Sequence, residues 1–334
     1  MNSTDTTTLD NARLHIFHTK FWIILVFLVP AIAVSIFIFA FFTKHYHALK
    51  VPQNFALLLL LIVNFCRLSF SMPLTLHFYL LGYISPASPI YCTWWTAFEY
   101  TSFVSSAFLL AAISVQRHML IFNGPFLKKP WMRTLLHDLP LILCLIYPVL
   151  FYLFAIILYP CDGTQWDYTN NGCGFADCYF AFDKVLGTFD MLVNSATPVI
   201  IDITANVILI VRVARQKRRL QQSVAWRQQR RMILQLFCLS GLFFVAWMPG
   251  VIIMLVQMLY DPMFLLEIQM DYLFDLIDVE YVFLPWVSLA FFPELNKWMK
   301  KVFSCRPAIN QVGTSRQQQL DSKPVRVVNH SAMN

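Results

Sequence analysis

The chain has few charged residues for its length. Only 13% of its 334 residues are Asp, Glu, Lys or Arg, about half the share found in a typical soluble domain. Hydrophobic residues make up 58%, and the mean hydropathy is +0.59. The 31 phenylalanines also exclude a disordered chain or a nucleic-acid-binding one. The composition therefore indicates that lipid, rather than water, surrounds much of the chain.

The apolar runs lack the strict alternation of membrane β-strands and are longer than the ~10 residues that such strands need. Backbone groups in lipid must then be satisfied within helices, which need ~20 apolar residues to cross the hydrocarbon core. Seven stretches qualify: 20–43, 54–81, 92–122, 136–159, 184–212, 231–259 and 267–291. We expect an all-α membrane protein, a seven-transmembrane helix bundle.

The rest of the chain divides around this bundle. Residues 1–19 form a polar N-terminal segment, and residues 20–305 hold the bundle with a short amphipathic eighth helix at its end. Residues 306–334 are polar and without periodicity, so we expect a disordered tail.

Basic residues are nearly missing from one set of connecting segments. If the N-terminus is extracellular, the outer segments hold only Arg13, Lys20 and Lys184, and every other Lys and Arg except Arg67 falls on the inner side. Basic loops stay in the cytoplasm, so we expect a multi-pass plasma-membrane protein with an extracellular N-terminus. The pI near 9.0 reflects this topology and attraction to anionic lipid, not nucleic-acid binding.

Four cysteines fall on the outer side, where disulfides persist: Cys92, Cys161, Cys173 and Cys178. They permit three pairings. No cluster of histidines accompanies them, so we expect no metal site. Asn2 begins an Asn-Ser-Thr sequon on the same side and is a predicted glycosylation site.

Several landmarks recur at consistent spacing along the spans. Cys92 opens the third span, and Gln116-Arg117-His118 closes it, with Arg117 twenty-five residues after Cys92. The sixth span carries Phe243 and Ala246-Trp247-Met248-Pro249, and the seventh carries Leu284-Pro285-Trp286-Val287-Ser288. Together these landmarks resemble the rhodopsin-like (class A) G-protein-coupled receptors over residues 20–305.

The resemblance implies a role for each landmark. Arg117 would hold the inactive state and then meet a heterotrimeric G protein, although Gln116 stands where the family has an acid. Trp247, with Phe243 and the kinking Pro249, matches the family's toggle, through which ligand pressure swings the inner half of the span outward. Pro285 would bend the seventh span, where Ser288 replaces the family's tyrosine.

The same resemblance predicts further features. Cys92 is expected to form a disulfide with Cys173 or Cys178, and Cys305 is a predicted palmitoylation site. Arrestin is a further expected partner. The seventh span has no Lys for a retinal Schiff base, so no cofactor is expected.

Charged and aromatic residues gather at the outer ends of the spans. Glu99 lies two turns after Cys92, where aminergic receptors carry an Asp, and Asp190 lies eight residues before Pro198. Asp271, Asp275 and Asp278 share one helical face, and Trp95 and Trp247 offer aromatic faces suited to cations. We expect Glu99, Trp95, Asp190, Trp247, Asp275 and Asp278 to contact a ligand with a basic group.

Arg67 offers an alternative role for some of these acids. It lies near mid-membrane in the second span and must find an anion, for which Asp278 and Glu99 are the candidates. An internal ion pair between Arg67 and Asp278 would then fix the helices. Asp202, four residues after Pro198, would pair across the bundle.

The expected activity is that of a receptor and not of an enzyme. A peptide ligand is favoured over a monoamine, because the fifth span lacks the serine cluster typical of catecholamine sites and the long outer loop with three cysteines suits a lid. A cation or proton channel using Asp271, Asp275 and Asp278 remains an alternative. A transporter is disfavoured because the chain has no internal repeat.

Overall fold

The computed structural model describes most of the chain: residues 3–122, 130–175, 178–217, 223–261, 263–291, 295, 298 and 299. The predicted glycosylation site Asn2, the predicted palmitoylation site Cys305 and the tail 306–334 lie outside these residues. Within the described part all regular structure is helical, as predicted.

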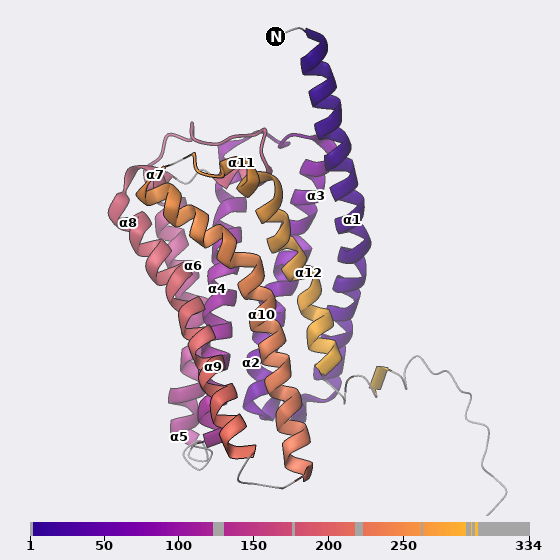
Figure 1. The fold of residues 1–334 in the computed structure, drawn as a ribbon, viewed down its shortest axis with the longest axis vertical. Coiled ribbons are helices and arrows are strands. Elements are labelled where there is room, and N and C mark those ends of the chain that lie inside the picture. The colour runs from indigo at the N-terminus through magenta and orange to yellow at the C-terminus, as the bar shows by residue number, and fades with distance from the viewer. Residues whose placement is uncertain are drawn as a thin grey trace, which may run out of the picture.

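Seven spans cross the molecule side by side (Figure 1). In chain order they are α1 (Ser3–Lys44); α2 (Pro52–Cys66) with α3 (Met72–Leu81); α4 (Pro89–Phe122); α5 (Pro130–Arg133) with α6 (Leu139–Tyr152); α8 (Lys184–Phe189) with α9 (Thr197–Lys217); α10 (Ser223–Leu259); and α11 (Leu266–Ile268) with α12 (Phe274–Phe291). A short helix, α7 (Cys178–Phe182), lies in the loop before α8, at the end of the bundle that the charge pattern predicts to be extracellular and that is called the outer end below. Because α4 packs against α2, α6 and α9, it forms the centre of the bundle.

The largest differences from the predicted spans are at the starts of two helices. The first starts at Ser3, inside the segment predicted as a polar leader, and α10 starts at Ser223 rather than near 231. The apolar run marks only where a helix is buried in lipid. Extending a helix that already exists costs much less than nucleating one, so the polar flanks continue it.

Six spans in the described residues are apolar enough to cross a membrane by composition alone. The seventh, α12, is long enough but carries Asp275, Asp278 and Glu280. Asp278 and Glu280 are buried inside the bundle, as expected for ionisable groups at membrane depth. The predicted seventh span is therefore correct, and two of its three acids are buried in the protein interior.

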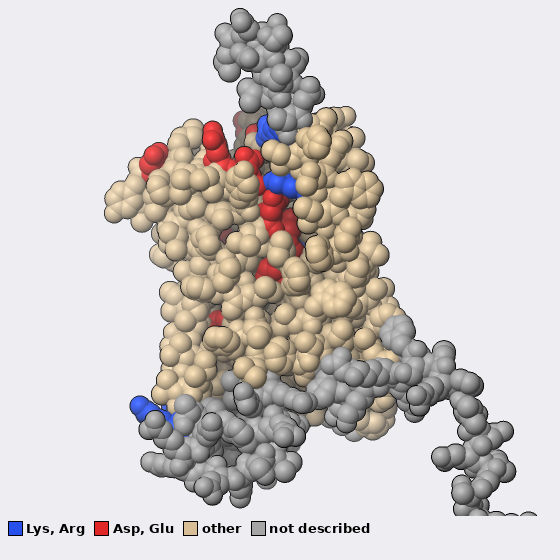
Figure 2. All heavy atoms as spheres, turned by 45° about the vertical axis from the view of Figure 1, so that its right-hand side comes forward, with Lys and Arg blue, Asp and Glu red and all other residues tan. Residues whose placement is uncertain are grey.

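The exposed surface fits a lipid environment. Large apolar side chains cover the outside of the spans, among them Ile23, Val149 and Ile200. Exposed aromatic residues mark both ends, with Trp22 and Trp94 toward the outer side and Trp131 toward the inner side. Figure 2 shows acidic side chains gathered at the outer end of one face and continuing inward, while the surrounding band is nearly free of charge.

Widened π-helical turns interrupt three spans directly before a proline. The N–H groups of Met72, Leu139 and Thr197 each bond to the carbonyl five residues earlier, and the next residues are Pro73, Pro140 and Pro198. Proline lacks an N–H, and its ring clashes with the carbonyl four residues before it. The wider turn accommodates the ring, and it adds one residue to that turn of the helix.

The outer loop is fixed by two disulfides. Cys92 at the start of α4 pairs with Cys173, the first of the two predicted partners, and Cys161 pairs with Cys178. Cys173 and Trp166 are buried against the outer ends of the helices. The loop therefore lies over the bundle as a lid.

Three residues of the predicted eighth helix are described. Leu295 is buried, and Trp298 contacts the rings of Phe41 and His45 at the inner end of α1. The rest of that predicted helix lies outside the described residues.

Candidate ligand-binding pocket

A cavity of about 230 Å³ opens in the outer half of the bundle, beneath the lid. Apolar and aromatic side chains from α4, α10 and α12 supply part of its lining, including Phe103, Trp247 and Ile277. Asn171 and Phe180 reach it from the outer loop. A mostly apolar cavity with a few polar groups is typical of a small-molecule or side-chain binding site.

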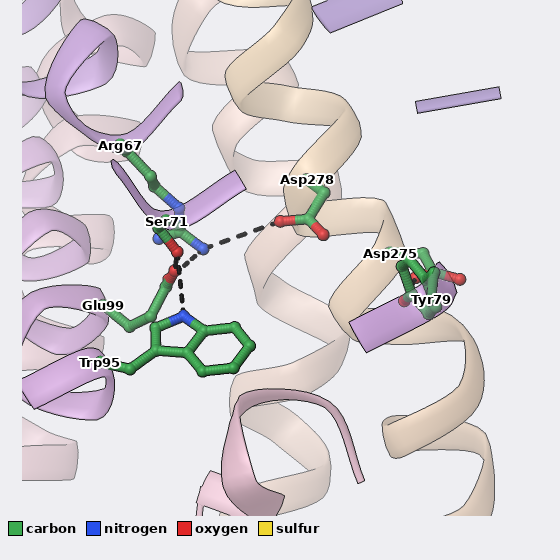
Figure 3. A network of polar contacts seen from close by, with 7 residues as sticks. All are labelled: Arg67, Ser71, Tyr79, Trp95, Glu99, Asp275 and Asp278. Carbon is green, nitrogen blue, oxygen red and sulfur yellow. Dashed lines mark hydrogen bonds and ion pairs between the residues drawn. The ribbon is translucent and has the colours of Figure 1, made fainter. Parts of the chain in front are cut away.

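Arg67 is the cation of this cavity, and it has two acidic neighbours (Figure 3). Its Nη2 lies 2.5 Å from Oε2 of Glu99 and 3.9 Å from Oδ1 of Asp278. Its guanidinium also lies 3.8 Å from the ring centroid of Tyr281. The side chain is only 5% exposed, so its charge is neutralised inside the protein, chiefly by Glu99.

Glu99 is held on both of its oxygens. Besides the ion pair with Arg67, it accepts a hydrogen bond from the hydroxyl of Ser71, which accepts one from the indole N–H of Trp95 at 3.1 Å. Arg67 and Ser71 are the first and last residues of the π turn before Pro73. The proline-induced turn thus sets both partners of Glu99 on the pocket side of the second span.

Asp275 and Asp278 face different surroundings, although they lie on the same helix (Figure 3). Asp275 pairs with Lys20 of α1 at 2.7 Å and accepts a hydrogen bond from the hydroxyl of Tyr79. It is not among the residues that line the cavity, whereas Asp278 is. The structure therefore separates two acids that the sequence placed together as ligand contacts.

Asp190 lines the cavity, but its carboxylate already accepts hydrogen bonds from three side chains. Tyr152 and Asn194 donate to Oδ1 at 2.7 and 2.6 Å, and Tyr179 of α7 donates to Oδ2 at 2.8 Å. The last of these bonds ties the lid to the fifth span. Asp190 thus serves as an anchor for the lid as well as part of the lining.

The lid is also tied to α1. Arg13 donates a hydrogen bond to the side chain of Asn170 at 3.2 Å. Partial burial alone would raise the pKa of the nearby Asp167, but hydrogen bonds from Thr169 and Asn170 and the charge of Arg13 lower that pKa below its ordinary value. Asp167 therefore keeps its charge and its loop-forming hydrogen bonds in mildly acidic surroundings.

Trp247 connects the cavity to the inner half of α10. Its ring stacks on Phe103 with centroids 3.6 Å apart and lies 6.1 Å from Phe243 one turn below. Pro249 follows two residues later inside the same helix. A group that enters the cavity therefore presses on aromatic rings next to a hinge.

The predicted coupling residues lie at the inner ends of the spans. Arg117 is 3% exposed, and His118 beside it is half-buried. Gln116 donates a hydrogen bond from Nε2 to the carbonyl of His137 at 3.0 Å, which joins the third span to the fourth. On α12, Pro285 and Ser288 are buried.

Several residues of the site escaped prediction. Ser71, Tyr79 and Tyr179 are hydrogen-bond donors to the predicted acids, and Lys20 had been counted only as an outer charge. Of these residues, only the position of Ser71 had a signal in the sequence. That signal is Pro73, because the π turn before Pro73 places Ser71 beside Glu99.

A family model described as 7 transmembrane receptor (rhodopsin family) matches residues 34–288. No curated protein matches the chain.

Proposed function

The chain belongs to the rhodopsin family of seven-transmembrane receptors, and from this premise we propose that it binds an extracellular ligand in the outer pocket and activates a heterotrimeric G protein. The observation that carries this proposal is the aromatic stack of Phe103, Trp247 and Phe243, which joins the cavity to α10 below Pro249. A ligand that favours another position of Trp247 shifts the bundle toward an open cytoplasmic face. Arrestin is proposed as a second cytoplasmic partner.

The proposed ligand is a peptide that inserts a basic group into the cavity. Four charged residues line it, one guanidinium and three carboxylates, so a cation entering from outside is attracted. About 230 Å³ suits one side chain or terminus, or a small amine, rather than a whole peptide. The rest of such a peptide would then contact the outer loop that forms the lid.

The channel alternative fits the geometry less well. The row of Asp271, Asp275 and Asp278 could conduct cations only if each carboxylate were free to bind and release them. Asp275, the middle one of these acids, is paired with Lys20 at 2.7 Å. This basic partner interrupts the row of acids and favours a receptor.

We expect a peptide and amine library, applied to cells that express the chain with a promiscuous Gα, to contain an agonist that promotes nucleotide exchange. Arg117→Ala should abolish that response and leave agonist binding in place, because Arg117 lies at the inner end of α4, far from the cavity. The readouts are nucleotide exchange and binding of the same labelled agonist. Membrane current without a G protein, or full signalling by Arg117→Ala, would contradict the proposal.

A further inference from the structure

Asp278 differs from the other carboxylates of the cavity in what surrounds it. Glu99 accepts from Ser71 and pairs with Arg67 at 2.5 Å, and Asp190 accepts from three side chains. In the described part of the chain, the only polar contact of Asp278 is Arg67 at 3.9 Å, too long for a hydrogen bond. Its side chain is 8% exposed and lines the cavity.

The charge of Arg67 does not offset both of its neighbours. One guanidinium faces Glu99 and Asp278, and the shorter contact goes to Glu99. A buried carboxylate without donors is unfavourable. The cavity beside Asp278 is the space from which donors can reach it.

From these contacts we infer that Asp278 is the counter-ion of the ligand, and that Glu99 is a positioning residue that keeps Arg67 away from it. The ligand group is a single ammonium or guanidinium that carries N–H donors. Such donors form charge-assisted hydrogen bonds with a carboxylate, which a trimethylated ammonium cannot do. The site thus selects protonated amines over quaternary ones of the same charge.

This inference deepens the proposed function and rests on its pocket, but its test needs neither the receptor's own agonist nor a G protein. Gly250 lines the cavity, and a Cβ built on it meets nothing within 4 Å. The variant Gly250→Cys therefore places a thiol in open space. The rate at which this thiol is labelled is measured on receptor at the cell surface with two reagents, the cationic 2-aminoethyl methanethiosulfonate and the anionic 2-sulfonatoethyl methanethiosulfonate. The parent chain gives the background labelling of Cys66, Cys144 and Cys238.

We expect the cationic reagent to react faster by about tenfold or more, the local enrichment typical of an acidic cleft. Asp278→Asn should bring the ratio toward one, whereas the matched variant Asp275→Asn, outside the lining, should leave it unchanged. Tryptamine should slow labelling more than its N,N,N-trimethyl derivative. An unchanged ratio in Asp278→Asn, or equal protection by both amines, would overturn the inference. If Gly250→Cys does not reach the surface, Ser195→Cys, also in the lining, replaces it.

A separate polar cluster occupies the inner half of the bundle. Asp202 of α9 accepts hydrogen bonds on Oδ1 from Ser114 of α4 at 2.5 Å, from Asn206 at 3.0 Å and from Ser240 of α10 at 3.0 Å. Asn206 also donates to Ser240 at 2.9 Å. All four residues are buried. One carboxylate therefore joins three spans between the Pro249 hinge and the cytoplasm.

These bonds oppose the movement that the proposed function requires of α10. When the inner half of α10 moves outward, Ser240 leaves both Asp202 and Asn206, and buried donors and acceptors lose their partners. We infer that the Asp202 cluster is a latch that holds the closed state and sets the basal activity. It shares no residue with the cavity, so ligands act on it only through the helices that connect the two.

The latch is tested by measuring the distance between two spin labels, without ligand or G protein. The labels are attached at Val115→Cys on α4 and Phe237→Cys on α10, two exposed positions, in a Cys238→Ser background. Ser240→Ala should raise the population with a long distance by about fivefold, the factor for one net hydrogen bond. The control is Ser35→Ala, whose hydroxyl bonds only within α1. A distance distribution in Ser240→Ala equal to the parent's would refute the latch, even if the receptor signals.

Discussion

Glu99→Gln is expected to be among the most destabilising single changes in the outer half of the bundle. Arg67 is 5% exposed, and its 2.5 Å partner is Glu99. Removing one member of a buried ion pair typically costs about 3–5 kcal/mol, because the other charge stays buried. Since Asp278 still lies 3.9 Å away, we expect a loss near the lower end, about 3 kcal/mol. The measurements are the surface expression and the thermal unfolding of purified protein.

The matched control removes both charges. In Arg67→Gln/Glu99→Gln the two amides bond to each other and leave no buried charge, so most of the lost stability should return. If the double variant is as unstable as Glu99→Gln, or if Glu99→Gln unfolds like the parent, Glu99 is not the structural partner of Arg67. Reduced agonist affinity with full stability would then restore Glu99 as a ligand contact.

Cys92→Ser is the second change expected to have a large effect. The Cys92–Cys173 disulfide spans 81 residues and attaches the lid to the outer end of α4. Losing a disulfide costs about 2–5 kcal/mol, and more for longer loops, when its main effect is on the entropy of the unfolded chain. We expect lower thermal stability and a lid that no longer covers the cavity.

Cys161→Ser serves as the comparison, because its disulfide with Cys178 spans only 17 residues. It should reduce the unfolding temperature less than Cys92→Ser under the same conditions. The reverse order would show that the short disulfide carries the lid. Unfolding temperatures of both purified variants decide between these outcomes.

Hydropathy and charge were enough to predict the fold and its spans. The apolar runs located all seven spans, and even α12, with its three acids, was placed correctly because apolar residues such as Val279 and Phe283 continue on its exposed side. The runs did not give the true ends of α1 and α10, since polar residues extend a helix once lipid has stabilised its core.

The site was harder to predict than the fold. The sequence identified Arg67 and its two candidate partners, but not which partner would be closer. That choice depends on the π turn that brings Ser71 beside Glu99. Likewise, the i, i+4, i+7 spacing put Asp271, Asp275 and Asp278 on one face, yet Lys20 and Tyr79 engage Asp275 and leave Asp278 to the cavity. Such partners come from other helices and leave no periodic signal.

The widened turns before Pro73, Pro140 and Pro198 also affect how this receptor is aligned with others. Each residue of an α-helix turns the chain by about 100°, so an extra residue in one turn changes which way every later side chain points. Asn64 lies in α2, three residues before the π turn. If a relative with an unbroken second span is aligned at Asn64 without a gap, Ser71 is assigned to the wrong side of the helix. Residue positions should therefore be aligned separately before and after each π turn. A segment exchanged between relatives should include the whole π turn together with its proline.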